Sequence, residues 1–230
     1  MKALPIVLIL PCILLAADFF DNFESLSPDD NLNSSYYWLQ LDPGGSLIAA
    51  DDAGDMITET AWSSYSYFGY VCLGSAIWSD GTVSADIKFT GSEAPLGFLA
   101  RADALTGETY MGGIYPVLPP IGATVIAYVD SAGNYEILTN DFLYPLSADT
   151  WYNVSFKITG NGPVNLELSV NGTVNSSVQD GTYDLGPGAC GIGGVFETTA
   201  PMFYIDDFNV DDFNTAMART TFGAIKALFR

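Results

Sequence analysis

Strict alternation of apolar and polar side chains is the feature of this sequence that most restricts its fold. It occurs in three segments, 83–89, 152–158 and 164–170, in which every second residue is apolar. Side chains of a β-strand point alternately to its two faces, so each segment predicts a strand with one buried and one solvated face. Such strands bury their apolar faces when two sheets pack together. The sequence therefore predicts an all-β antiparallel β-sandwich of the jelly-roll type.

Turn sequences separate the predicted strands at short intervals. Asn171-Gly172 is a preferred sequence for a two-residue hairpin turn and stands between Val170 and Thr173. The segment 130–134, Asp-Ser-Ala-Gly-Asn, predicts a second turn. Frequent glycine and proline along the rest of the chain are typical of a sandwich with many short connections.

The segment 203–210 is an apolar strand interrupted by two adjacent acids, Asp206 and Asp207. Its apolar residues before the acids, Phe203 and Ile205, have the opposite phase from those after them. Two explanations fit this slip. Either a β-bulge lies at the acids, or one carboxylate points into the core, where it needs a cation or several hydrogen-bond donors.

The first residues resemble an export signal. A short basic start is followed by an apolar run at 3–15 and by small residues before Asp18. We therefore interpret 1–17 as a signal peptide and 18–212 as one secreted domain, extracellular or in the cell envelope. The apolar run is too short for a comfortable transmembrane helix, and no later segment is long and apolar enough to span a bilayer.

The residues after the predicted sandwich, 213–230, differ from the rest of the chain. They are basic, and Phe222, Ile225 and Phe229 have helical spacing. This pattern predicts a short amphipathic helical tail. The tail either addresses the protein to a sorting machine or the envelope, or packs on the sandwich, or is disordered. Signal and tail together are typical of a bacterial exported protein.

Charge and composition exclude several functions. The chain has 27 acidic and 7 basic residues, for a net charge of −20. Such an acidic protein is a poor partner for nucleic acid and for anionic membranes. It suits an extracellular setting or bound divalent ions, although solubility alone also explains it. The absence of histidine excludes Ser-His-Asp and Cys-His catalysts and the common zinc, copper and iron sites.

Two cysteines, Cys72 and Cys190, remain after the predicted signal cleavage. In an oxidising compartment they either form one long-range disulfide or remain two buried thiols. The sequence does not show whether their Cα atoms come close enough for a bond.

Several blocks along 19–210 together resemble the concanavalin A-like lectin/glucanase superfamily, in particular its LamG-type jelly rolls. These blocks are 19–25 with Trp38, then 83–89, 96–101, 151–158, 170–172 and 204–208. The resemblance implies two antiparallel sheets that face each other, with the first and last strands adjacent.

The resemblance also implies a structural Ca²⁺ near the two terminal strands. Carried onto this chain, its ligands are Asp21, Glu24, Asp206 and Asp207. Calcium takes six to eight oxygen ligands, which two adjacent strands could supply together with water. The alternative is a bulge or surface turn without metal. A second acidic cluster, 51–55, lacks the spacing of an EF-hand loop and predicts a solvated turn.

The sequence lacks the Glu-x-Asp-x-Glu strand of the related hydrolases, so a non-catalytic sugar-binding role is favoured. Aromatic rings stack on sugar rings but also fill cores. The candidate ligand-binding residues are Trp62, Tyr65, Tyr67, Trp78, Tyr110 and Tyr115. The resulting interpretation is a lectin-like domain for polysaccharide or cell-surface glycan. A structural or adhesive protein with self-association is the first alternative, and a polysaccharide hydrolase is the second.

Overall fold

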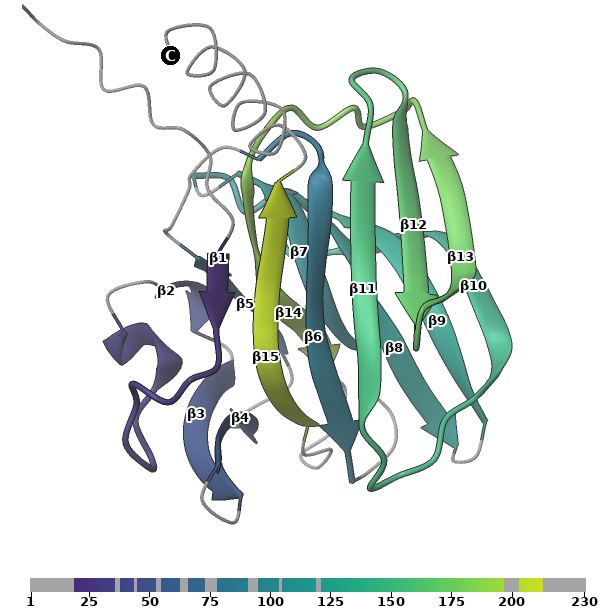
Figure 1. The fold of residues 1–230 in the computed structure, drawn as a ribbon. Helices are drawn as coiled ribbons and strands as arrows, with labels where there is room; N and C mark the ends of the chain where they lie inside the picture. The colour runs from purple at the N-terminus through teal and green to yellow at the C-terminus, as the bar shows by residue number, and fades with distance from the viewer. Residues whose placement is uncertain are drawn as a thin grey trace, which may run out of the picture.

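The computed structural model describes residues 19–35, 38–43, 45–52, 55–62, 66–72, 78–90, 95–103, 105–118, 121–196 and 203–212. Within these ranges, fifteen strands form two antiparallel sheets, and there is one short 3-10 helix, η1 (Leu32–Ser34). The sheets lie face to face (Figure 1). The predicted all-β sandwich is confirmed. No helix of the described part is long and apolar enough to cross a membrane.

The first sheet has eight strands and contains both ends of the described chain. In spatial order its strands are β13 (Thr173–Asp180), β12 (Val164–Val170), β11 (Tyr152–Thr159), β6 (Gly81–Phe89), β15 (Phe203–Asp212), β4 (Asp55–Trp62) and β3 (Gly45–Asp52), with β1 (Phe19–Asp21) also paired to β15.

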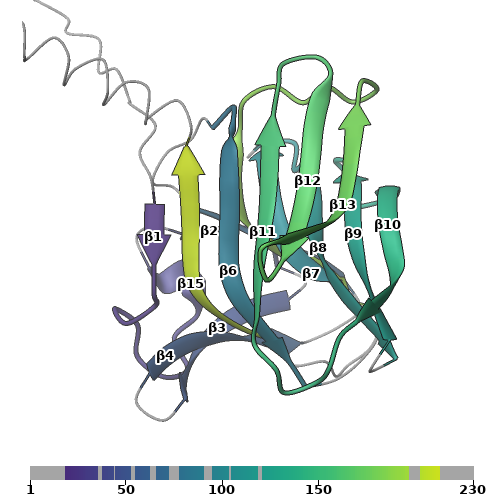
Figure 2. The same ribbon diagram turned by 45° about the vertical axis from the view of Figure 1, so that its right-hand side comes forward.

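The second sheet has seven strands and lies behind the first in Figure 1. Its spatial order is β10 (Tyr135–Pro145), β9 (Ile121–Val129), β8 (Thr109–Leu118), β7 (Leu96–Ala102), β14 (Ala189–Phe196), β5 (Ser66–Cys72) and β2 (Trp38–Pro43). The turned view of Figure 2 shows the edge strands β13 and β10 on the same side of the sandwich.

The three alternating segments form β6, β11 and β12, which are neighbours in the first sheet. Phe156 of β11 lies opposite Val83 of β6 and Leu168 of β12, and all three are fully buried. The turn predicted at Asn171-Gly172 joins β12 to β13. Both residues have positive φ, 51° and 76°, as a two-residue hairpin turn requires. Each of these predictions is confirmed.

The slip in the last strand is a β-bulge. The register of β15 against β6 shifts between Asp206 and Asn209, and Asp207 has a φ of 50°. Asp206 is half-buried and Asp207 is exposed. The extra residue lets both phases of the strand face the core, where the buried side chains are Phe203, Ile205, Phe208 and Val210. The bulge alternative is therefore confirmed.

The first and last strands are adjacent, as the sequence resemblance implied. Asp21 of β1 lies opposite Phe208 of β15. The Trp38 ring contacts Phe208 with ring centroids 4.9 Å apart, and the Trp38 Nε1–H donates to Asp21 Oδ2 at 2.7 Å. This cluster of rings ties the N-terminal strand to the middle of the sheet.

A row of glycines crosses the seven-stranded sheet. Gly69, Gly193, Gly97 and Gly113 lie opposite one another in the adjacent strands β5, β14, β7 and β8. A Cβ on Gly97 would lie 2.2 Å from the Gly112 oxygen, and a Cβ on Gly113 would lie 2.1 Å from the Leu96 oxygen. The close approach of β7 and β8 therefore requires glycine at both positions.

A buried arginine joins three loops at one end of the sandwich. The Arg101 side chain is only 2% exposed. Its guanidinium donates to the backbone oxygens of Ser79, Leu185 and Gly160 and contacts Asp80 Oδ1 at 3.3 Å. A buried charge with this many acceptors is well satisfied, so its loss leaves several acceptors without a donor.

We predict that Arg101→Met lowers the free energy of unfolding by about 3 kcal/mol, because carbonyl groups and a carboxylate lose a buried partner. Urea denaturation measures this change. Lys157→Met is the matched control, since Lys157 pairs with Glu167 at 3.0 Å on the exposed face. A surface pair of this kind contributes less than about 1 kcal/mol. Equal losses in the two variants would contradict the assignment of Arg101 as a structural hub.

The two remaining cysteines lie at neighbouring positions of the second sheet. Gly191 of β14 lies opposite Val71 of β5, so the next pair in the same register is Cys190 with Cys72. The Cys190 side chain is buried. The register agrees with a cross-strand disulfide, which stays a prediction.

We expect protein recovered from an oxidising compartment to carry the Cys72–Cys190 bond, because adjacent strands bring the two Cα atoms within bonding range. Peptide mapping without reduction should find one peptide pair joined through these residues, and reduction should separate the pair. Alkylation of both thiols in unfolded, unreduced protein would show that the bond is absent.

The predicted signal peptide (1–17) and helical tail (213–230) lie outside the described residues and also stay predictions.

Candidate functional site

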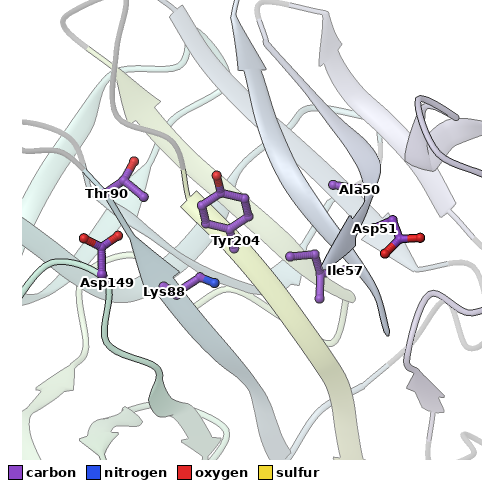
Figure 3. Close-up of a pocket in the computed structure, with 7 residues that line it drawn as sticks. All are labelled: Ala50, Asp51, Ile57, Lys88, Thr90, Asp149 and Tyr204. Carbon is purple, nitrogen blue, oxygen red and sulfur yellow. The ribbon is translucent and has the colours of Figure 1, made fainter. Parts of the chain in front are cut away.

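A pocket of about 270 Å³ opens on the outer face of the eight-stranded sheet (Figure 3). Its lining comes from β3, β4, β6 and the residue after it, β15 and the loop before β11: Ala50, Asp51, Ile57, Lys88, Thr90, Asp149 and Tyr204. Ligand pockets usually measure roughly 300–1,000 Å³. The space is therefore suited to a small group, or to one unit of a longer ligand.

Strand alternation points the central residues of the pocket away from the core. Lys88 of β6 lies directly opposite Tyr204 of β15, while their neighbours Ile87 and Ile205 are buried. The Lys88 and Tyr204 side chains therefore share the solvent face of the sheet. Figure 3 shows Thr90 and Asp149 on one side of the Tyr204 ring and the β3 and β4 residues on the other.

The floor and rim of the pocket differ in polarity. Ala50 of β3 pairs with Ile57 of β4, and this pair gives the pocket an apolar part. Asp149, in contrast, is exposed and has a φ of 56°. Its backbone N–H donates to the Phe89 oxygen at 2.8 Å, which fixes the loop against the end of β6. Polar and apolar groups thus converge on one small space, as in sites that orient a polar ligand.

Lys88 also holds two aromatic rings together. Its ammonium lies 4.6 Å from the centroid of the Trp151 ring and 4.8 Å from that of Tyr204. Both distances are within the range of cation–π attraction. Trp151 is 37% exposed although it is a large apolar side chain. The rings therefore form an ordered platform that is partly open to solvent.

A pair of carboxylates lies on the same face, next to the pocket. Asp206 of β15 is directly opposite Asp86 of β6, two residues along each strand from Tyr204 and Lys88. The Asn153 side chain donates from Nδ2 to Asp86 Oδ1 at 2.8 Å. Like charges directly opposite each other destabilise a sheet. This arrangement therefore makes the surface beside the pocket negative.

Two of the aromatic residues singled out from the sequence are core residues. Trp78 and Tyr110 are 1% and 0% exposed. The Tyr110 hydroxyl donates to Asp180 Oδ2 at 2.5 Å, and burial together with this hydrogen bond raises the pKa of Tyr110. Neither residue presents a ring face to solvent. Tyr115 is half-buried and packs against a small apolar cluster around Val125.

The other three predicted rings are not placed. Trp62 ends β4 and Tyr67 lies in β5, but their side chains, like Tyr65 as a whole, lie outside the described residues. Their role in ligand binding stays a prediction. Trp151 was not among the residues predicted to bind a ligand, although its position in the sequence is informative. It precedes the alternating segment 152–158 in the polar phase, where a large ring is unexpected.

A second polar cluster braces the edge of the sandwich. The rings of Tyr128 and Tyr183 are stacked, with centroids 3.7 Å apart. The Tyr128 hydroxyl donates to Glu108 at 2.9 Å, and the Tyr183 hydroxyl donates to Glu136 at 2.5 Å. Burial, followed by the bond to Glu108, raises the pKa of Tyr128 to about 12. The phenols therefore stay protonated, and the cluster holds the loop after β13 against β9 and β10.

The predicted calcium ligands come from β1, from the turn after it and from β15, and Asp21 has other partners. Its carboxylate accepts hydrogen bonds from Trp38 Nε1 and, at 2.8 Å, from the Phe23 N–H. Glu24 and Asp207 are exposed, and Asp206 lies at the bulge. Within the described ranges, no three or more Cys, Asp or Glu side chains gather as a group that could hold a metal ion. The set therefore does not form a preassembled calcium site.

Calcium binding stays a prediction that a melting experiment can test. If Asp206 and Glu24 hold Ca²⁺, saturating Ca²⁺ should raise the melting temperature and chelator should lower it, since a ligand that binds only the folded state stabilises it. Mg²⁺ at the same concentration is the control for ionic strength. Superimposable melting curves in Ca²⁺ and in chelator would contradict the prediction.

The five central strands of the seven-stranded sheet contrast with the pocket face, because they lack acidic residues. Five consecutive strands, β9, β8, β7, β14 and β5, contain no Asp or Glu. Leu99, Met111 and Val129 of these strands belong to a small apolar cluster separate from the main core. These strands therefore offer no carboxylate pair for acid–base chemistry.

Comparisons with known proteins agree with this architecture. No protein-family model and no curated protein matches the sequence. Among solved structures, the carbohydrate-binding module CBM66 from Bacillus subtilis matches with 12% identity and a TM-score of 0.53, over 74% of this chain and 92% of that one. Cellulose induced protein Cip1 matches with 15% identity and a TM-score of 0.56, over 84% and 96%.

A catalytic protein is equally similar. The β-glucanase of Bacillus licheniformis matches with 11% identity and a TM-score of 0.57, over 86% of this chain and 98% of the glucanase. At such identities the similarity describes the fold alone. The chain has the jelly-roll fold of the concanavalin A-like lectins and glucanases.

Proposed function

We propose that this chain is a secreted, non-catalytic domain that binds polysaccharide or cell-surface glycan at the pocket formed by β3, β4, β6 and β15. The observation that carries the proposal is the platform of Trp151 and Tyr204 around the Lys88 ammonium. Trp151 is partly exposed and contacts Lys88, which lines a pocket that has both apolar and polar groups.

The chemistry of the pocket suits a sugar. One face of a pyranose ring presents C–H groups, which pack against an aromatic ring, while its hydroxyls need hydrogen-bond partners. Trp151 and Tyr204 supply the rings. Asp149 and Thr90 at the rim supply polar groups within the same pocket. A few polar groups around an apolar surface are the usual means by which a site orients its ligand.

The distribution of carboxylates supports binding without hydrolysis. Glycoside hydrolysis in this kind of enzyme uses two carboxylates on opposite sides of the scissile bond. The five central strands of the second sheet carry none. Asp86 and Asp206 are adjacent on the first sheet, and a test for hydrolysis therefore accompanies the binding test. Solved proteins of this fold include both a carbohydrate-binding module and a glucanase.

A structural or adhesive role is the second candidate. The edge strand β10 exposes Ile137, Phe142 and Leu143, with 43%, 52% and 84% of their surfaces accessible. Exposed apolar side chains on a sheet edge favour pairing with another copy or another protein. Such a protein would need no soluble ligand.

We predict that Trp151→Ala weakens retention on a bound polysaccharide by roughly ten-fold or more, because a ring contact of about 1.5 kcal/mol is lost. Affinity electrophoresis of the domain against a panel of neutral and charged polysaccharides measures this effect. Phe142→Ala is the matched control, since it removes an exposed ring from the other sheet. It should bind like the unmodified chain.

Three outcomes would count against the proposal. Equal weakening by both variants would place binding elsewhere. Release of reducing ends from the retained polymer, lost in Asp206→Asn, would identify a hydrolase. Folded protein that is retained by no polymer but self-associates as its concentration rises would favour the structural role.

A further inference from the structure

Among the described residues in and beside the pocket are four carboxylates, those of Asp51, Asp149, Asp86 and Asp206, and the ammonium of Lys88. We infer that the site selects its glycan by charge, so that it binds neutral polysaccharides and excludes those with uronate or sulfate groups. The inference rests on the proposed function, because it concerns the same pocket. The inference specifies that the ligand is a neutral glycan, whereas the two aromatic rings alone do not distinguish neutral from anionic glycans.

Two carboxylates flank the pocket itself. Figure 3 shows Asp149 on one side of Tyr204 and Asp51 on the other. Both residues are exposed. A sugar seated on the Tyr204 ring would therefore have a carboxylate at each side. These groups accept hydrogen bonds from sugar hydroxyls, but they repel a carboxylate or sulfate on the sugar.

The positive charge of the pocket is Lys88. Its ammonium lies over the Trp151 and Tyr204 rings, so it is attracted to the π faces of both rings. An anionic sugar would gain one attraction to Lys88 and meet repulsion from Asp51 and Asp149. The net charge of these three groups is negative.

The negative surface continues beyond the pocket. Asp86 and Asp206 face the same side as Lys88 and Tyr204, two residues further along β6 and β15. Two residues of a strand span about 7 Å, which is of the order of one sugar unit. A polymer that leaves the pocket along these strands passes the carboxylate pair at its next unit. Uronate or sulfate groups on successive sugars would be repelled at both places.

The net charge of the whole chain, −20, adds a general repulsion of polyanions. A test must therefore separate the pocket from the rest of the surface. Each unit charge within about 7 Å of a ligand charge changes affinity by roughly two- to three-fold in water. Removal of two charges in or beside the pocket should thus increase binding of an anionic polymer by roughly four- to nine-fold at low salt.

Calorimetry with three matched polymer pairs tests the inference: hydroxyethylcellulose with carboxymethylcellulose, methyl-esterified with de-esterified homogalacturonan, and dextran with dextran sulfate. Where the protein binds a polymer pair, we expect its affinity for the neutral member to be higher than for the anionic member by roughly ten-fold or more at about 10 mM ionic strength. The difference should largely disappear at about 1 M salt, where the Debye length is near 3 Å.

Two double variants locate the effect. Asp149→Asn with Asp206→Asn removes two charges from the site and keeps the oxygen that Asp206 uses to accept from the Asp207 N–H. Asn also tolerates the positive φ of residue 149. The matched control, Asp141→Asn with Asp184→Asn, removes two charges elsewhere, in β10 and in the loop before β14. Only the first double variant should reduce the difference in affinity between neutral and anionic polymers, and it should do so several-fold.

The outcomes separate this inference from the proposed function. Equal affinity for both members of a pair, or preference for the anionic one, overturns charge selection and leaves glycan binding intact. If both double variants reduce the difference in affinity equally, charge selection is also overturned, because the net charge of the chain alone would then explain the preference for neutral polymers. If none of the six polymers binds, or if Trp151→Ala leaves binding unchanged, the proposed function fails and the charge inference fails with it.

Discussion

The β-bulge at Asp207 is the local constraint on which the rest of the first sheet depends. Without the extra residue, either Phe203 and Ile205 or Phe208 and Val210 would face solvent. With it, all four are buried, and β15 pairs with β6 on one side and with β1 and β4 on the other. Burial of several large apolar side chains outweighs the cost of a strained backbone at one residue. The same strand then directs Tyr204 and Asp206 outward.

Much of the fold could be predicted from the sequence because its signals are local. Period-two alternation and the Asn171-Gly172 turn depend on neighbouring residues, and β6, β11, β12 and the hairpin follow from them. The role of aromatic rings could not be predicted in this way. Trp78 and Tyr110 lie in sequence contexts like those of exposed rings, yet the packing of the second sheet buries them. Trp151 is 37% exposed, and the cation that lies over its ring, Lys88, comes from a distant segment of the chain.

The candidate site and the acid-free strands belong to opposite sheets. One sheet presents rings, an ammonium and carboxylates to solvent, and the central strands of the other contain only apolar, glycine, hydroxyl and arginine residues. The fold is shared by binding modules and hydrolases, so its chemistry depends on the side chains that each sheet carries. In this chain several polar groups of the candidate site lie on β6 and β15, whose inward side chains are buried in the core.

The glycine row restricts which substitutions this sequence can accept. At Gly97 and Gly113 the obstacle to a side chain is the main chain of the facing strand, so no change of rotamer can make room. A larger residue at either position must be accompanied by a separation of β7 from β8, which would break the backbone hydrogen bonds of both. A side chain larger than glycine at one of these two positions therefore also affects the other, although the positions lie in different strands. Substitutions should therefore be tolerated around Gly97 and Gly113 more readily than at either glycine.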